Sequence, residues 1–275
     1  MQDSATPNSF ASAASGSVLN ASGAAPLVLV CEHASPFIPE VFGRLGLDEE
    51  SASAHIAWDP GALDVAKAMS EALNAPLVAA NYSRLLYDLN RPPEAATAMP
   101  ERSETYDVPG NRDLDDAAKK ERIAALYHPF HALVAATIED VQKRSGQAPA
   151  LVTIHSFTPV YFGQKRETEL GILFDADDRL AQLMLARAPG FTRLTAEPNQ
   201  PYSPADGVLH TLEMHGAEKN LPRAMLEIRN DLVATKAAAD LVAGELAGLL
   251  AETMAIMDLE TGRLSRPAPK ARAVW

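Results

Sequence analysis

Residues 27–35 of the chain are Leu-Val-Leu-Val-Cys-Glu-His-Ala-Ser, and we expect the fold to be organised around this stretch. Its first five residues are apolar without alternation, which is typical of a strand buried on both faces and predicts a central strand of an α/β sheet. Glu32, His33 and Ser35 follow the apolar run directly. Because reactive groups of open α/β sheets gather beyond the carboxyl ends of the strands, His33 is a candidate functional residue.

Outward from this stretch, apolar strand patterns alternate with helical ones. Strands are predicted over residues 76–80, 84–89, 150–154, 169–174, 191–195 and 223–228. Helices are predicted over residues 60–74, 115–144, 177–187, 208–220 and 231–258, with the second interrupted at Pro129 because proline lacks an amide hydrogen. The alternation favours a three-layer α/β/α sandwich with a mostly parallel, mixed sheet.

The length of 275 residues and a hydrophobic content of 47% suit one catalytic domain, which we place over residues 25–260. Residues 1–24 are rich in Ala, Ser, Gly and Asn without periodicity, which predicts a disordered tail. Residues 261–275 are basic and contain proline, and are expected to be loose. The aperiodic stretch 92–111 is predicted to be a surface excursion, and loops of this length are often functional lids.

Composition excludes several classes of partner. The formal net charge of −12 argues against nucleic-acid binding, which requires clustered Lys and Arg. No stretch approaches the apolar length of a membrane span, so no membrane association is expected. Cys31 is the single cysteine and lies in the apolar run, so it is expected to be a core residue without a disulfide partner, as in a cytoplasmic protein.

Two predicted strands end in histidine, at His33 and His155, and another delivers Glu227. Two imidazoles with a carboxylate form the usual protein ligand set of catalytic zinc, which leaves a fourth position open. The alternative for either histidine alone is a buried side chain with a hydrogen-bond partner. Two histidines at the ends of strands favour a site.

Arg84, Asn90 and Arg91 form a second polar group. A guanidinium binds a carboxylate through two parallel hydrogen bonds, so this group suits a substrate carboxylate. The alternative is that these residues pair with acidic neighbours on a solvated loop: Asp88, Glu94 and Asp107.

An ordered set of segments resembles the N-formylglutamate amidohydrolase family over about residues 26–250. The segments are His-Ala-Ser at 33–35, His-Ile-Ala-Trp-Asp-Pro-Gly-Ala at 55–62, Ser-Arg-Leu-Leu-Tyr-Asp-Leu-Asn-Arg-Pro at 83–92, Tyr-His-Pro-Phe-His at 127–131, Ile-His-Ser-Phe-Thr-Pro at 154–159 and Glu-Ile-Arg-Asn-Asp at 227–231. More distantly, Asp-Leu-Asn-Arg at 88–91, His-Ser at 155–156 and Glu-Ile-Arg at 227–229 resemble motifs of zinc carboxypeptidases in the same order.

The resemblance implies a carboxypeptidase-like fold, zinc bound by His33 and His155, a substrate carboxylate bound by Asn90 and Arg91, and Glu227 as general base. One departure is Pro36, which stands where the carboxypeptidase pattern has a ligand Glu. We expect Asp59 as third ligand, because its Trp-Asp segment belongs to the amidohydrolase pattern. Rival roles are a helix cap for Asp59, and ligation by Glu32 or Glu40.

Further polar residues are assigned as follows. Arg229 and Arg84 are expected to help hold the substrate carboxylates. His131 is expected to contact substrate or to hydrogen-bond to a ligand, in preference to forming a metal pair with His128. The remaining candidates are His55 as a partner of Asp59, Tyr202 as a pocket residue, and His210 and His215 as ordinary surface or core residues.

The expected activity is therefore zinc-dependent hydrolysis of a small anionic N-acylamino acid, with N-formyl-L-glutamate giving formate and glutamate. Alternatives are a zinc hydrolase of another N-acylamino acid or small peptide, and a non-catalytic module that binds an acidic ligand.

Overall fold

The structure is a computed structural model, and it describes residues 14–260. Within them, seven strands form one mixed sheet in the order β1-β3-β2-β6-β11-β9-β10. β3, β2, β6 and β11 run parallel, β1 and β9 run antiparallel to β3 and β11, and β10 runs parallel to β9. The bounds are β1 Gly16–Leu19, β2 Leu27–Cys31, β3 Leu77–Ala80, β6 Ala150–Phe157, β9 Leu170–Leu173, β10 Ala196–Pro198 and β11 Arg223–Arg229.

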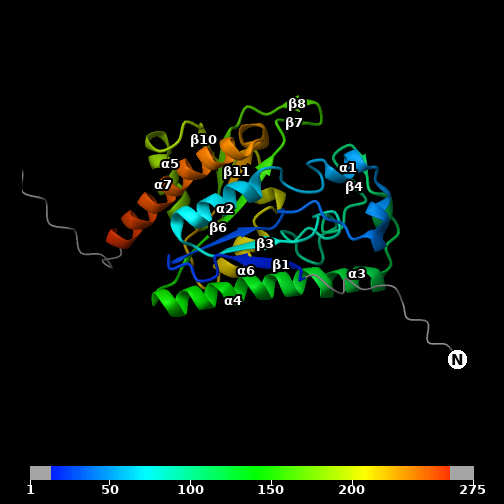
Figure 1. The fold of residues 1–275 in the computed structure, drawn as a ribbon, viewed down its shortest axis with the longest axis horizontal. Helices are drawn as coiled ribbons and strands as arrows, with labels where there is room; N and C mark the ends of the chain where they lie inside the picture. The colour runs from blue at the N-terminus through cyan, green and yellow to red at the C-terminus, as the bar shows by residue number, and fades with distance from the viewer. Residues whose placement is uncertain (1–13, 261–275) are drawn as a thin grey trace, which may run out of the picture.

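Helices cover both faces of this sheet (Figure 1). α2 (Ala62–Leu73), α5 (Arg179–Arg187) and α7 (Lys236–Glu260) lie on one face, and α4 (His128–Ser145) and α6 (His210–Gly216) lie on the other. Leu27 and Leu29 pack towards the first layer, whereas Val28 and Val30 pack towards the second. Burial on both faces explains the unbroken apolar run of β2, and the predicted α/β/α sandwich is confirmed.

The predicted interruption at Pro129 is present. α3 (Asp116–Arg122) continues into the π-helical turn η3 (Ile123–Tyr127), and α4 follows with Pro129 in its first turn. Proline cannot donate to the preceding turn and its ring crowds that turn, so a locally wider helix accommodates it.

The turn before α2 determines where Asp59 lies. Gly61 has φ +82°, and a Cβ there would lie 2.6 Å from the Val233 carbonyl oxygen. Only glycine tolerates both the positive φ and this close approach. α2 ends at Asn74, whose left-handed conformation caps the helix as predicted.

Three predicted elements are wrong. Within the expected disordered tail 1–24, Gly16–Leu19 form β1, which pairs with β3; residues 1–13, like the expected loose tail 261–275, lie outside the described range. Residues 84–89 form turns and not a strand, because the Ser83 hydroxyl and carbonyl accept local backbone hydrogen bonds. Residues 191–195 also turn, with the Leu194 amide donating to Thr192 Oγ1, and β10 begins only at Ala196.

Smaller elements surround the carboxyl ends of the strands. The excursion 92–111 contains the hairpin β4 (Arg102–Ser103) and β5 (Tyr106–Asp107), and a second hairpin consists of β7 (Val160–Tyr161) and β8 (Gln164–Lys165). The others are η1 (Glu40–Gly46), α1 (Glu49–Ser53), η2 (Pro109–Asn111), η4 (Ala188–Gly190), η5 (Pro204–Asp206) and η6 (Asn230–Val233). Among the described residues, every helix is too short or too polar to span a membrane.

Candidate active site

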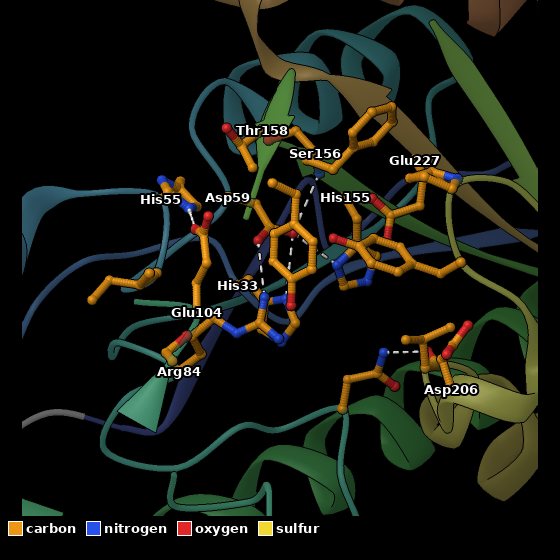
Figure 2. A pocket seen from close by; sticks show the side chains of 18 of the residues that line it. His33, His55, Asp59, Arg84, Glu104, His155, Ser156, Thr158, Asp206 and Glu227 are labelled. Atoms are coloured by element: carbon orange, nitrogen blue, oxygen red, sulfur yellow. Dashed lines mark hydrogen bonds and ion pairs between the residues drawn. The ribbon is translucent and has the colours of Figure 1, made fainter. Parts of the chain in front are cut away.

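The structure brings His33, Asp59 and His155 together at the carboxyl ends of neighbouring strands. His33 follows β2, His155 lies in β6, and Asp59 precedes α2. Asp59 Oδ2 lies 3.3 Å from His33 Nδ1 and 2.9 Å from His155 Nδ1, and the two imidazole centroids are 4.9 Å apart (Figure 2). All three side chains are buried, and their ligand atoms lie within 4.8 Å of one another.

Each histidine presents its other nitrogen to a second carboxylate. His33 Nε2 hydrogen-bonds to Asp88 Oδ1 at 2.8 Å, whereas His155 Nε2 makes an ion-pair contact of 3.1 Å with Glu32 Oε2 that lacks hydrogen-bond geometry. A metal-binding histidine usually donates its free ring nitrogen to a carboxylate, which fixes the tautomer and the ring orientation. Both Nδ1 atoms face Asp59, an arrangement that could hold a metal ion.

The charge of this region also suits a cation. Four buried carboxylates, those of Glu32, Asp59, Asp88 and Glu227, surround the two histidines. Arg84 contacts two of them, with Nη2 2.6 Å from Asp88 Oδ2 and Nη1 3.4 Å from Asp59 Oδ1. Although burial alone raises the pKa of Asp59, the nearby histidines outweigh it and hold this pKa well below its usual range. A divalent cation held here would offset the remaining negative charge, and the donor set of two imidazoles and a carboxylate fits zinc.

The rival third ligands lie elsewhere. Glu32 faces the Nε2 side of His155, away from Asp59, and Glu40 is exposed on η1. Asp59 is not a side-chain cap of α2, since only its carbonyl accepts from the Ala62 amide. Of the three carboxylates considered from the sequence, Asp59 is the one that lies between the histidines.

Glu227 stands beside His155. The two residues pair in the register of β11 with β6, and both line the same cavity of about 530 Å³ (Figure 2). Glu227 Oε2 is buried and accepts no hydrogen bond from the described residues. Burial raises the pKa of Glu227 to about 7, because removal from water disfavours the charged carboxylate. A carboxylate with this pKa both takes and returns a proton near neutrality.

The cavity is lined by Arg84, Asn90 and Arg91, which have different hydrogen-bond and ion-pair partners. Arg84 pairs with Asp88, one of the acidic neighbours considered from the sequence. The Asn90 side chain donates to the Val208 carbonyl and accepts from the Thr211 amide, so it holds the start of α6. Arg91 Nη1 donates to backbone carbonyls, and no carboxylate within residues 14–260 pairs with this guanidinium.

Two residues expected to contact substrate lie outside the cavity lining. Arg229 pairs with Asp231 at 2.8 Å and donates to the carbonyls of Arg166 and Glu167. His131 is buried between α4 and α6, where its ring nitrogens contact His215 and the Leu89 carbonyl. His131 thus supports the loop that carries Asp88 and Asn90.

Other lining residues carry no sequence signal strong enough to select them. Arg166, Tyr161 and Glu104 come from the two short hairpin segments, where no apolar periodicity marks a buried face. His55 bonds to Glu104 at 2.7 Å, so it is not the expected partner of Asp59. Tyr202 lines the cavity as predicted.

The pair of His131 and His215 has a consequence for stability. His131 Nε2 donates to Leu89, so its Nδ1 must accept from His215 Nε2, 2.9 Å away. Desolvation lowers the pKa of His131 to about 3 and that of His215 to about 4, from an ordinary value of 6.5. The two imidazoles are therefore neutral in the folded protein at pH 5, whereas they bind protons in the unfolded chain.

We expect the free energy of unfolding of the metal-free protein to fall as pH falls from about 6.5 towards about 4, by up to about 1.4 kcal/mol per pH unit for each histidine. Urea unfolding at several pH values measures this slope. In the His215→Gln variant, the slope of the free energy of unfolding against pH should decrease by the contribution of about one proton. His128→Gln, at an exposed position of α4, should keep the wild-type slope. Identical slopes in the two variants would contradict the assignment.

Two imidazoles and a carboxylate at the strand ends of an α/β/α sandwich, with a buried carboxylate beside them, define a hydrolase-type site with a candidate metal centre. The family model of N-formylglutamate amidohydrolase matches residues 25–234, and the chain belongs to this family. The family is one of hydrolases that act on an amide.

Two solved structures are similar to this chain. A gene product of Agrobacterium tumefaciens is 48% identical, with a TM-score of 0.86 over 90% of this chain and 97% of the other. N-formylglutamate amidohydrolase from Ralstonia eutropha is 20% identical, with a TM-score of 0.63 over 89% and 99% of the respective chains, and this likeness shows the fold alone. No curated protein matches the chain.

Proposed function

We propose that the protein is a zinc-dependent amidohydrolase that converts N-formyl-L-glutamate and water to formate and L-glutamate. The observation that carries the proposal is the convergence of His33, Asp59 and His155 beside a buried Glu227. Membership of the amidohydrolase family supports the same reaction. His33 Nδ1, His155 Nδ1 and Asp59 would hold the zinc, which when bound supplies Lewis acidity that acidifies a water molecule and polarises an amide oxygen.

Glu227 is the proposed general base. It accepts a proton from the water whose oxygen attacks the formyl carbon, and it then delivers that proton to the amide nitrogen as the C–N bond breaks. The products are formate and the free amino group of glutamate. The raised pKa of Glu227 suits both transfers, because neither a strongly acidic nor a strongly basic group performs both near pH 7.

Orientation of the substrate is the proposed task of Arg91, whose guanidinium has no carboxylate partner in the described chain. We assign it the α-carboxylate. Arg84 and Asn90 support this position indirectly, because Arg84 orients Asp88 and Asn90 orients the segment that starts α6. Holding the substrate in one pose converts binding energy into a lower barrier.

The kcat/KM values for three substrates test the proposal. The kcat/KM value for N-formylglutamate should be at least about tenfold higher than the values for N-formylaspartate and N-acetylglutamate. One methylene group in a fitted pocket changes kcat/KM by about 10- to 200-fold. Initial rates of amine release measure the values for each compound. Equal and very low activity on all three would remove N-formylglutamate as the substrate.

A further inference from the structure

Arg166 lies directly after β8 and lines the cavity with its guanidinium among aromatic rings. The guanidinium carbon lies 4.2 Å from the Tyr161 ring centroid and 4.9 Å from the Tyr202 centroid. Its Nη1 donates to the Tyr202 hydroxyl at 3.0 Å. Stacking on rings fixes the plane of a guanidinium while its edges stay available as hydrogen-bond donors.

Arg166 has no carboxylate partner within residues 14–260, although Lys165 next to it pairs with Glu167 at 2.9 Å. Three arginines line the cavity, and Arg84 is already paired with Asp88 and Asp59. The other two, Arg91 and Arg166, make no ion pair with any carboxylate of the described residues, including those that line the cavity. Two such cations match a ligand with two carboxylates.

The backbone at Arg166 is held from two sides. Its amide donates to the Pro159 carbonyl at 2.8 Å across the β7–β8 hairpin. Arg229 Nη1 donates to the Arg166 carbonyl at 3.3 Å and to the Glu167 carbonyl at 3.1 Å, while Asp231 holds Arg229 Nε. A cation on a short exposed hairpin is thus tied to the end of β11, the strand that carries Glu227.

Resting on the proposed function, we propose that Arg166 binds the side-chain carboxylate of an N-formylated acidic amino acid, and that Arg229 positions Arg166. The substrate then spans the cavity between Arg91 and Arg166, with its formamide at His33 and His155. Arg166 becomes the residue that selects a negatively charged side chain over a neutral one of the same size.

The test compares N-formyl-L-glutamate with N-formyl-L-glutamine, which has nearly the same shape and a neutral side chain. Arg166→Gln should lower kcat/KM for N-formylglutamate about 100-fold, mainly through KM, and change the value for N-formylglutamine less than about threefold. Arg166→Lys should retain more of the preference for N-formylglutamate over N-formylglutamine than Arg166→Gln does. Lysine keeps the positive charge but cannot form the two parallel hydrogen bonds of a guanidinium. Lys165→Gln, one residue away and outside the cavity lining, is the matched control and should leave both values unchanged.

Arg229→Gln tests the positioning role. It should raise KM for N-formylglutamate and leave KM for N-formylglutamine and kcat for both substrates unchanged. A purely structural role predicts equal losses on the two substrates, and that result would overturn the positioning assignment.

Failure of this inference is distinguishable from failure of the proposed function. An Arg166→Gln variant that is unaffected, or equally impaired on both substrates, would overturn the role of Arg166. If the wild-type protein hydrolyses neither compound, the proposed function fails, and titration calorimetry with glutarate tests Arg166 by itself. Glutarate should bind the wild-type protein and bind Arg166→Gln at least about tenfold more weakly; equal binding, or no binding to the wild type, would overturn the inference.

Discussion

Replacing Glu227 with glutamine should lower kcat for N-formylglutamate hydrolysis by about 100- to 10,000-fold, the range that a positioned general base contributes. Glutamine has the same shape and cannot take a proton from water. Glu227 Oε2 accepts no hydrogen bond from residues 14–260, so the substitution breaks no protein contact of that oxygen. Zinc content and KM should therefore stay near their wild-type values.

Steady-state kinetics near neutral pH measure the effect, and metal analysis of the same sample shows whether the metal content is unchanged. Glu213→Gln, an exposed glutamate on α6, is the control and should keep wild-type turnover. Near-normal kcat in Glu227→Gln would show that another group transfers the proton.

Loss of zinc from His155→Ala is the second large effect. The wild-type protein, purified without chelator, should contain about one zinc ion per chain, and the variant should contain almost none after dialysis. In the proposed centre the imidazole is one of three protein donors, and its removal also leaves Asp59 and Glu32 without a shared partner. Metal analysis by mass spectrometry measures the content, and activity should fall with it.

Variants of the carboxylates distinguish ligands from their neighbours. Asp59→Ala should lose zinc as completely as His155→Ala. Glu32→Gln, which acts through His155 Nε2, should weaken zinc affinity only about 10- to 100-fold. Glu40→Gln is the control, because this exposed glutamate lies on η1. A wild-type protein without zinc, whose hydrolysis neither zinc nor cobalt restores, would contradict the metal-dependent proposal.

Much of the site was predictable because it depends on strand ends. The apolar runs before His33 and His155 mark strands buried on both faces, and in a parallel sheet the ends of such strands meet at one edge. Glu227 was predictable in the same way, because it lies near the end of the buried strand β11. Asp59 was predictable only through the family pattern, since no apolar periodicity shows that the turn at Gly61 directs its carboxylate to the histidines.

Other features had no local signal. β1 is four residues long, and it is ordered by backbone pairing with β3, which a sequence pattern does not reveal. Residues 84–89 contain apolar side chains that are buried inside a turn-rich loop, and a short apolar run of this kind has the same sequence pattern as a buried strand. The sequence predicts Arg229 as a cavity residue, but the cavity is lined by Arg166, whose carbonyl accepts a hydrogen bond from Arg229.

Local apolar patterns and ordered segments were sufficient to predict the layered α/β architecture, the two strand-end histidines, the general-base candidate Glu227 and the resemblance to an amidohydrolase family. Three further assignments required the folded structure: the carboxylate that joins the histidines, the carboxylates that contact their other nitrogens, and the cavity arginines that make no ion pair with the described residues. Those assignments depend on distances between side chains far apart in the chain. Such distances follow from packing and hydrogen bonding across the whole fold, so no short stretch of sequence contains them.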